Sequence, residues 1–530
     1  MPFPPTTTVL IAGGGPVGLT LSILLSRYGV DHLLVEARPD TARHPKARGV
    51  SARSMEILRR CGLEDEIRGA GLPASQVRFY RGRDLVDPDF VRSGVAHDPA
   101  GAEEHTPSPG LICSQDVLEP ILLRRARESA AARIRFGTRL LTGAADGGGV
   151  SAVLEDLAGG GRHEVRAQWL VGCDGAGSTV RTGAGIGMDG PTGLGHFLSV
   201  RFEAPLGAVV ADRASASYFL TPPGRGGFMA VDNDRHWIYQ YPFDPDRPPG
   251  GADLTDRRQL ADLVRAAAGL PDLEVTVRDT AFWRMDARLA SAYRRGRVLL
   301  AGDAAHVVPP TGGHGMNTGI GDADNLAWKL AAVTDGRATT DLLDSYQAER
   351  RPVARQVIDL SADNARARAG YRIDDELLLT AAYRSAAIVA APGAPVRPPV
   401  DASGYHPSGE PGCRAPHSRL TGPPGSSSTL DLVGTGFTLI TADGTPAWQH
   451  RADAAAAAGL PVTVHTLGAG RLREEHPGAF GRLCGVPASG AVLVRPDGHV
   501  AWRAAAPPAG PELARVLRSV LTGAAHPARP

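Results

Sequence analysis

Three motifs of glycine and aspartate, far apart in the chain, have the residue types of a nucleotide site. The first, Gly13-Gly14-Gly15-Pro16-Val17-Gly18, joins the apolar run Val9–Ala12 to a helix-like stretch from about Pro16 to Tyr28. These glycines allow a tight turn, and the helix then offers free N–H groups and positive potential to a diphosphate. A second apolar run ends at Glu36, where an acid can accept hydrogen bonds from a ribose. This order predicts a dinucleotide-binding unit rather than an ordinary α/β turn.

The other two motifs each follow an apolar run. Cys173-Asp174-Gly175 comes directly after Trp169–Gly172, and Gly302-Asp303-Ala304-Ala305-His306 follows Val298–Ala301. Both therefore read as strand and then turn. For Asp174, an aspartate that only stabilises its own turn is the alternative.

On these motifs the sequence resembles the class A flavoprotein aromatic hydroxylases, which have the para-hydroxybenzoate hydroxylase fold. It is most similar to the branch that acts on phenols and aromatic polyketides. The resemblance is strong over residues 5–370 and weaker beyond them. It implies an α/β fold, FAD as cofactor and NADPH or NADH as a transient reductant. The implied reaction is hydroxylation of an electron-rich ring with molecular oxygen, through a C4a-hydroperoxyflavin.

The resemblance also implies which residues bind FAD. They are Gly13, Gly15, Pro16, Val17, Gly18, Glu36, Ala37, Arg48, Gln115, Asp174, Asp303, Pro310, Gly313, Gly315, Met316 and Asn317. The backbone amides near Met316 and Asn317 would stabilise negative charge on the reduced ring, as an oxyanion hole does. Pro310 would lie near the flavin edge where oxygen reacts, so these three are the catalytic candidates. His314 stands where the family more often has glutamine, and we expect its side chain to point to solvent.

Alternatives remain for two of these residues. Arg48 could be an ordinary surface arginine. Gln115 follows Ser114, which could serve only as the N-cap of the next helix.

The middle of the chain contains the substrate candidates. Residues 228–231 and 236–241 read as two strands joined by a turn. Alternation places Trp237, Tyr239 and Tyr241 on one face, and together with Tyr218 and Arg225 they are candidates for substrate contact. The sequence does not say which face meets the flavin, and an aromatic face is also typical of plain core.

The resemblance narrows the substrate class. Hydroxylases of small acids clamp the substrate carboxylate with an arginine and a tyrosine, and the matching positions here are His236 and Ile238. A simple hydroxybenzoate is therefore not expected. We expect a bulky polycyclic phenol or quinone of polyketide type, in natural-product tailoring such as antibiotic biosynthesis. Baeyer–Villiger insertion and oxidative rearrangement remain open.

The resemblance implies how the chain divides into domains, and composition marks the linker between them. We predict a Rossmann-like FAD-binding domain over 1–180 and 280–390, interleaved with a substrate-binding sheet over 181–279 whose strands could begin near 75. Residues 391–428 are rich in Pro and Gly and predict a linker. Residues 429–530 resemble a thioredoxin-like domain. Since the five cysteines form no CxxC, a packing or dimer role is expected there rather than redox chemistry.

Charge and cysteine usage exclude some partners. A net charge of +1 over 530 residues argues against nucleic acid or a membrane surface as partner. No signal peptide, membrane span or metal-ligand spacing is found, so a cytoplasmic monomer or homodimer without metal is expected. A disulfide reductase would need a second glycine loop and a cysteine pair, which the sequence lacks. A non-catalytic flavin-binding protein stays open.

Overall fold

The first sheet is built on parallel strands, as the strand, glycine turn and helix pattern predicts. In the computed structural model its order is β18–β19–β10–β1–β2–β7. The parallel strands are β1 (Thr6–Ala12), β2 (His32–Glu36), β7 (Ala132–Phe136), β10 (Arg162–Gly172) and β19 (Val298–Leu300). The antiparallel additions are β8 (Thr138–Ala145), β9 (Val150–Asp156) and β18 (Arg294–Arg295). Residues 3–44, 46–94, 103–222, 224–246, 255–366, 374–391, 393–441, 445–468, 472–508 and 510–523 are described.

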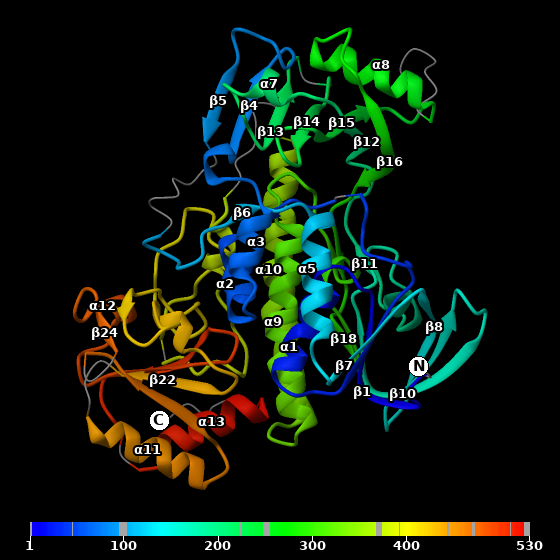
Figure 1. Ribbon diagram of the computed structural model, residues 1–530. Helices are drawn as coiled ribbons and strands as arrows, with labels where there is room; N and C mark the ends of the chain where they lie inside the picture. The colour runs from blue at the N-terminus through cyan, green and yellow to red at the C-terminus, as the bar shows by residue number, and fades with distance from the viewer. Residues whose placement is uncertain are drawn as a thin grey trace.

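Long helices cover this sheet (Figure 1). α1 (Pro16–Arg27) follows the glycine turn and contacts α9 (Gly315–Thr334), and α10 (Asp344–Arg366) runs beside α9. Pro16 suits the first helical position because it has no N–H to leave unpaired. Shorter helices are α2 (Ala52–Arg60), α3 (Glu64–Ala70), α5 (Gln115–Arg127) and α6 (Thr179–Gly183). Small ladders pair β3 (Gly49–Val50) with β6 (Leu111–Ile112), and β11 (Met188–Asp189) with β17 (Arg288–Ala290) and β20 (His306–Val307).

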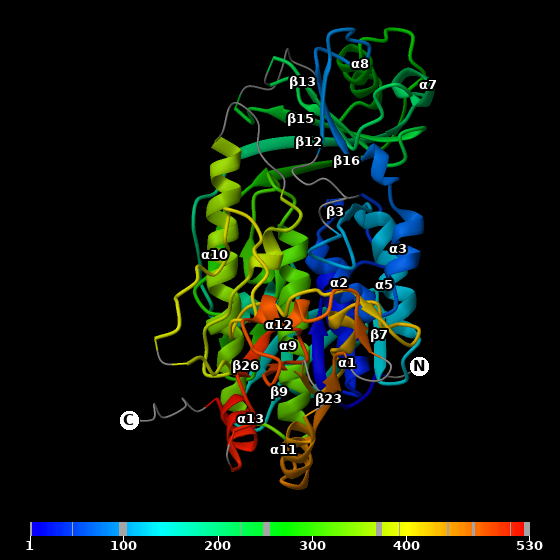
Figure 2. The same cartoon turned by 90° about the vertical axis from the view of Figure 1, so that its left-hand side faces the viewer.

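A second sheet lies across one end of these helices (Figure 2). Its seven strands are ordered β16–β12–β15–β14–β13–β4–β5. They are β4 (Arg78–Gly82), β5 (Val91–Gly94), β12 (Gly195–Glu203), β13 (Ser217–Leu220), β14 (Gly227–Ala230), β15 (His236–Phe243) and β16 (Thr276–Met285). α7 (Gly207–Val210) and α8 (Arg257–Ala268) complete this unit. β4 and β5 precede β7 to β10 of the first sheet in the chain, and the other strands of the second sheet follow them. The second sheet is therefore built from two separate segments of the chain.

The C-terminal unit is a four-stranded sheet of order β23–β22–β25–β26. β22 (Phe437–Thr441) and β23 (Val462–Thr466) are parallel across α11 (Pro446–Ala457), while β25 (Ala491–Val494) and β26 (Val500–Ala504) are antiparallel additions. α12 (Ala479–Cys484) and α13 (Glu512–Thr522) pack nearby, and β21 (Leu420–Thr421) pairs with β24 (Arg473–Glu474). A βαβ unit followed by a hairpin and a helix is the order expected of a thioredoxin-like domain.

The segment 391–428 differs from the expected linker. Arg414 is buried and pairs with Glu56 of α2, and His417 is buried against Ser428. Its proline and glycine content therefore belongs to a packed connection rather than to a flexible spacer.

Two features are absent from the described residues. None of the helices placed in these ranges is long and apolar enough to cross a bilayer. Within the same ranges no group of three or more His, Cys, Asp or Glu side chains is arranged to hold a metal ion.

Candidate functional site

A Cβ would overlap backbone atoms at two positions of the first glycine turn. Gly13 has φ of 108°, and a Cβ there would overlap the carbonyl oxygen of Cys173. A Cβ on Gly18 would overlap the carbonyl oxygen of Gly13. At Gly15, by contrast, the nearest atom to such a Cβ is 4.0 Å away, so its surface is open to a ligand. The turn therefore brings the first two motifs together and leaves one backbone face accessible.

The start of α1 fits an anion. Its first intrahelical hydrogen bond runs from the N–H of Leu19 to the carbonyl of Gly15 at 3.0 Å. The amides of Val17 and Gly18 precede that bond and have no partner in the helix. The first turn contains no acidic side chain that would compete with a phosphate. This donor set and the open Gly15 surface fit the diphosphate of a dinucleotide.

Glu36 lies at the end of β2 beside this turn. Its carboxylate accepts from the N–H of Gly14 at 2.6 Å and from the N–H and Nε of Arg38 at 2.9 and 3.0 Å. Burial raises the pKa of Glu36, but the hydrogen bonds from Arg38 and Gly14 outweigh that effect and hold it below its ordinary value. Glu36 is therefore an ionised acceptor next to the exposed Ala37. Its contact with a ribose stays a prediction.

Three further predicted segments converge on one another. Gln115 accepts from the N–H of Ala47 at 3.2 Å, and the N–H of Gln115 donates to the Ala47 carbonyl at 2.9 Å. Asn317 accepts from the N–H of Ser51 at 2.9 Å and donates to the carbonyls of Gly49 and Gly313 at 3.0 and 2.8 Å. The side chain of Asn317 thus ties the start of α9 to β3. The sequence pattern indicates a role only for the backbone of Asn317.

The two aspartates of the later motifs differ in what they contact. Asp174 accepts from Ser178 and from the N–H of Val180 at 3.0 Å, which supports the alternative of a structural aspartate at the start of α6. Burial raises its pKa. Asp303 is exposed directly after β19, and its carboxylate has no hydrogen-bond partner among the described residues. Of the two, Asp303 is the one available to a ligand.

The loop before α9 also presents unpaired donors. The amides of Gly315, Met316 and Asn317 precede the first bond of the helix, which runs from Thr318 to His314 at 2.8 Å. Pro310 and Gly313 are exposed on the same loop. Such amides could stabilise an anionic ring edge.

His314 corrects one expectation, because its side chain is buried and does not point to solvent. Its ring lies against Gly312, where a Cβ would come within 2.8 Å of its Cδ2. Burial lowers the pKa of His314 to about 4, so the ring is neutral at pH 7.

Comparison with known proteins agrees with this geometry. Residues 6–361 match the FAD binding domain family, and residues 408–524 match the aromatic-ring hydroxylase C-terminal family. The chain belongs to the FAD-dependent aromatic hydroxylases. It is 38% identical to the tetracenomycin B2 monooxygenase-dioxygenase of Streptomyces olivaceus, over 96% of this chain and 98% of that protein. It is 39% identical to aklavinone 12-hydroxylase RdmE of Streptomyces purpurascens, over 97% of this chain and 98% of that protein.

A solved structure extends the likeness to three dimensions. The ternary complex of aklavinone-11 hydroxylase with FAD and aklavinone is 36% identical and has a TM-score of 0.87, covering 97% of this chain and 99% of that chain. The enzyme class and the FAD cofactor predicted from the sequence are therefore confirmed, and NAD(P)H is the reductant standard for the family.

The hydroxylase's second sheet faces the FAD-binding domain with only one of its two sides. Arg48 donates to Ser217 Oγ at 2.9 Å and to the carbonyls of Ala216 and Ala230 at 2.9 and 2.8 Å. His44 lies 2.8 Å from Ser199 Oγ through its Nε2. Ser199 and Ser217 therefore mark the flavin-side face of the sheet. The implied contact of Arg48 with the flavin nucleotide stays a prediction.

This orientation corrects the substrate candidates. Tyr218, Trp237 and Tyr239 are buried in the opposite face against α8, and Tyr241 packs partly into the same core. Arg225 donates to the carbonyls of Arg83 and Ala266, again away from the first domain. The hydroxyls of the two buried tyrosines have partners inside the protein. Tyr239 donates to the Arg225 carbonyl at 2.6 Å, and Tyr218 donates to Asn233 at 2.8 Å. These aromatic side chains therefore belong to the core.

The flavin-side face has other residues. Cross-strand register places Phe79, Ser217, Met229, Ile238 and Arg201 in one row, and Arg81, Phe219, Gly227, Gln240 and Ser199 in the next. Strand alternation in the sequence already separates these residues from the aromatic ones. It does not show which of the two faces lies toward the first domain.

Glu119 is a second residue that the sequence analysis missed. It is fully buried, accepts from Gln115 at 2.6 Å and from the N–H of Ala42 at 2.6 Å, and its Oε1 is the atom nearest to Gly15. Its position four residues after Gln115 on α5 was the available signal.

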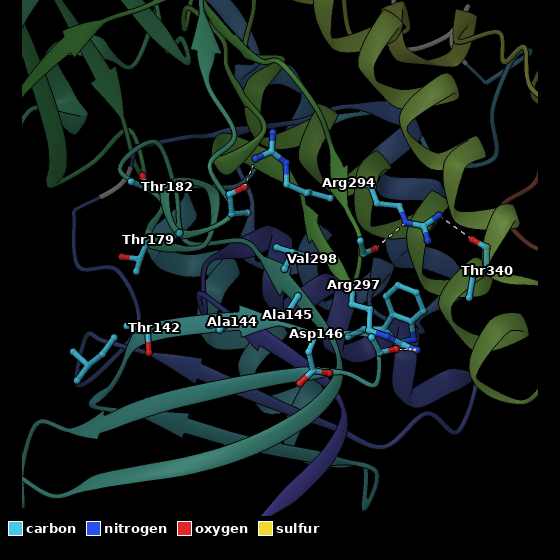
Figure 3. A pocket seen from close by; sticks show the side chains of 18 of the residues that line it. Thr142, Ala144, Ala145, Asp146, Thr179, Thr182, Arg294, Arg297, Val298 and Thr340 are labelled. Atoms are coloured by element: carbon cyan, nitrogen blue, oxygen red, sulfur yellow. Dashed lines mark hydrogen bonds between the residues drawn. The ribbon is translucent and has the colours of Figure 1, made fainter.

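A cavity of about 1100 Å³ lies between β8, α6 and the β18–β19 turn (Figure 3). Its described lining contains none of the predicted flavin residues. Arg294 donates to the Thr340 carbonyl at 2.9 Å and Arg297 to the Gly147 carbonyl at 3.3 Å, so these guanidinium groups hold the walls together. This cavity is not the flavin site.

Proposed function

We propose that this hydroxylase oxygenates a bulky polycyclic aromatic, a phenol or quinone of polyketide type, in natural-product biosynthesis. The observation that carries the proposal is the flavin-side face of the second sheet. Its apolar side chains are Phe79, Phe219, Met229 and the buried Ile238, and Gln240 adds an amide among them. Arg81 and Arg201 stand in the same two rows. A flat ring system can cover such a surface, and the amide can orient one ring oxygen.

The absence of a carboxylate clamp supports the same substrate class. Ile238 occupies one clamp position and offers no donor. His236 occupies the other, at the start of β15, where its Nδ1 lies 2.5 Å from Asp232. A small benzoate would find neither the arginine nor the tyrosine that fixes its charge. The relatives named for tetracenomycin B2 and aklavinone have polycyclic substrates by name, which also supports the proposal.

The chain's own groups divide the work. FAD, reduced by NAD(P)H, activates molecular oxygen for transfer of one oxygen atom to the ring. The amides of Val17 and Gly18 would bind the diphosphate of FAD, and the Asp303 carboxylate would accept a hydrogen bond from its ribityl chain. The amides of Gly315, Met316 and Asn317 would stabilise negative charge on the ring edge. The flavin-side face orients the substrate and excludes water.

The test is NAD(P)H oxidation by FAD-loaded enzyme with and without a panel of aromatics. Polycyclic phenols should stimulate oxidation and gain one oxygen, while hydroxybenzoates should not. Met229→Asp, which places a charge on the flavin-side face at a half-buried position, should lose the stimulation, and the core variant Trp237→Phe should keep it. Stimulation by hydroxybenzoates alone would overturn the proposal. A product in which oxygen entered a carbon–carbon bond would move the assignment to Baeyer–Villiger chemistry.

Location and assembly are proposed on separate grounds. Five free cysteines without a disulfide suit a reducing cytoplasm. A monomer or homodimer remains the predicted state.

A further inference from the structure

One buried arginine connects the two segments that face the flavin. Arg350 of α10 donates through Nε to Asp322 at 2.8 Å and through a terminal nitrogen to the Thr318 carbonyl at 2.9 Å. Thr318 belongs to the first turn of α9, directly after the free amides of 315–317. The two bonds therefore reach two different points of α9, one of them at its flavin end.

Asp322, which accepts from Arg350, also binds the turn that contains Gly302 and Asp303. Its Oδ2 accepts from the N–H of Gly302 at 3.1 Å and lies 2.7 Å from His306 Nε2. Gly302 precedes Asp303, the exposed aspartate of the third motif. Since Asp322 is fully buried, it needs these partners to remain ionised, and removing one leaves a poorly compensated buried charge.

The C-terminal domain completes the arrangement. The third nitrogen of Arg350 donates to the Tyr383 hydroxyl at 3.0 Å, and the Tyr383 ring stacks on His499 with centroids 4.0 Å apart. His499 ends the turn between β25 and β26. The neighbour of Arg350 on α10, Glu349, binds the same turn through Arg495 at 2.7 and 2.9 Å. Adjacent residues of one helix thus face the C-terminal turn and the flavin segments.

We infer that Arg350 is a positioning residue for the flavin. It fixes the start of α9 relative to the Gly302–Asp303 turn, and the C-terminal domain holds it in place through Tyr383 and His499. This role gives the C-terminal domain a part in the reaction without redox chemistry of its own. The inference rests on the FAD site of the proposed function and not on the identity of the aromatic substrate.

The experiment compares FAD affinity and the visible circular dichroism of bound FAD in three variants. Tyr383→Phe removes one hydrogen bond from Arg350 and keeps the stacked ring. Arg350→Lys keeps the charge but cannot span three acceptors. Arg59→Met is the matched control, because Arg59 also joins α2 to the C-terminal region, through Asp431 at 2.8 Å, without touching α9 or Gly302.

Tyr383→Phe should weaken FAD binding by about threefold, and Arg350→Lys by about tenfold or more, since a buried charge loses bonds. Both should alter the visible circular dichroism of the bound flavin. Arg59→Met should bind FAD as the wild type does, with an unchanged spectrum, even if its melting temperature falls. If Arg350→Lys does not fold, Tyr383→Phe decides.

Wild-type affinity and spectrum in both positioning variants would overturn the inference. Equal losses in Arg59→Met would do the same, because the effect would then be general loosening. Neither outcome depends on which aromatic is hydroxylated. Conversely, a wild-type enzyme that binds FAD but oxidises no polycyclic phenol would sink the proposed substrate class and leave this inference standing.

Discussion

The proposed flavin site and the C-terminal interface are both polar, but their polar groups are paired differently. In the flavin site the amides of 315–317 have no helical partner and Asp303 is exposed. In the interface Glu349 accepts from Arg495, Lys329, Asn325 and Ser385, and every one of its bonds is between 2.6 and 2.9 Å. Both Arg495 and Lys329 are fully buried. The ligand site keeps donors and acceptors unpaired, whereas the interface pairs its charged groups and leaves unpaired only neutral atoms such as Asn325 Oδ1 and His499 Nε2 among the described residues.

The difference appears in the consequences of protonation as well. Burial lowers the pKa of Lys329 to about 8 even though Glu349 opposes that shift, and Arg495 holds the pKa of Glu349 well below its usual range. Charges at the interface are thus mutually dependent. Substitutions in the flavin site should change binding, and substitutions in the interface should change stability.

The largest effect is expected at the glycine turn. Gly18→Ala would force a Cβ onto the Gly13 carbonyl, so the turn must open and the purified protein should contain no FAD. Flavin absorbance after purification measures this. Gly69→Ala on α3 is the control, since a Cβ there meets nothing within 4 Å. A flavin-replete Gly18→Ala protein would contradict the packing described for the turn.

Glu349→Gln should have the next largest effect, now on stability. Leaving Lys329 and Arg495 poorly compensated should cost about 3–5 kcal/mol of the free energy of unfolding. Urea denaturation is the measurement. Glu410→Gln breaks the half-buried pair with Arg397 and should cost about 1 kcal/mol or less. Equal losses in the two variants would remove the distinction between interface and surface.

Asp303→Asn changes an unpaired group of the proposed flavin site, whereas Glu349→Gln changes a paired group of the interface. The carboxylate of Asp303 has no hydrogen-bond partner among the described residues, and desolvation raises its pKa, so removing its charge should not lower the melting temperature of the FAD-free protein. FAD affinity should fall by about tenfold, since a hydrogen bond to a charged group is lost. Titration of the apoprotein with FAD measures the affinity. A destabilised apoprotein would mean that Asp303 already has a structural role.

The smallest effect concerns pH, and it involves one histidine from each region. Burial lowers the pKa of His314 and of His417 from 6.5 to about 4, with the Arg414 charge adding to the shift at His417. Between pH 6.5 and 4 the unfolded chain therefore binds protons that the folded chain does not, so stability falls as the pH falls through that window. At pH 5.5 each histidine should cost about 1 kcal/mol relative to pH 7.

Denaturation at pH 7.0 and 5.5 checks this pH effect. His314→Gln and His417→Gln should each reduce the difference between the two pH values by one histidine's share. A wild-type protein equally stable at both values would show that neither ring is protected from protonation.

Local patterns were enough for one part of the structure. The glycine turn, α1 and the end of β2 follow from residues that are neighbours in sequence, and so the first nucleotide motif could be predicted. The order of the thioredoxin-like strands is equally local. Strand alternation also predicted correctly that Trp237 and Tyr239 share a face.

Long-range contacts decided what the sequence left open. Two hydrogen bonds decide which side of the second sheet lies toward the first domain. One joins His44 to Ser199 and the other joins Arg48 to Ser217, and the partners are 155 and 169 residues apart. Arg414 packs the presumed linker against Glu56, 358 residues away. Periodicity describes a single strand or helix and contains no information about its partners. For the same reason the expected solvent exposure of His314 was wrong, and the sequence could not show that the aromatic substrate candidates pack on the side of the sheet that faces α8.

The buried turn 495–499 also determines when the contacts of Glu349 can form during translation. Arg495 leaves the ribosome 146 residues after Glu349, its partner on α10. At roughly 5–20 residues per second, the nascent chain waits about 7–30 s with that carboxylate lacking its arginine. The contacts between α10 and the C-terminal turn therefore cannot form until the turn has been synthesised. A message truncated late, after most of the flavin residues have been made, should still yield a chain that chaperones and proteases treat as unfinished.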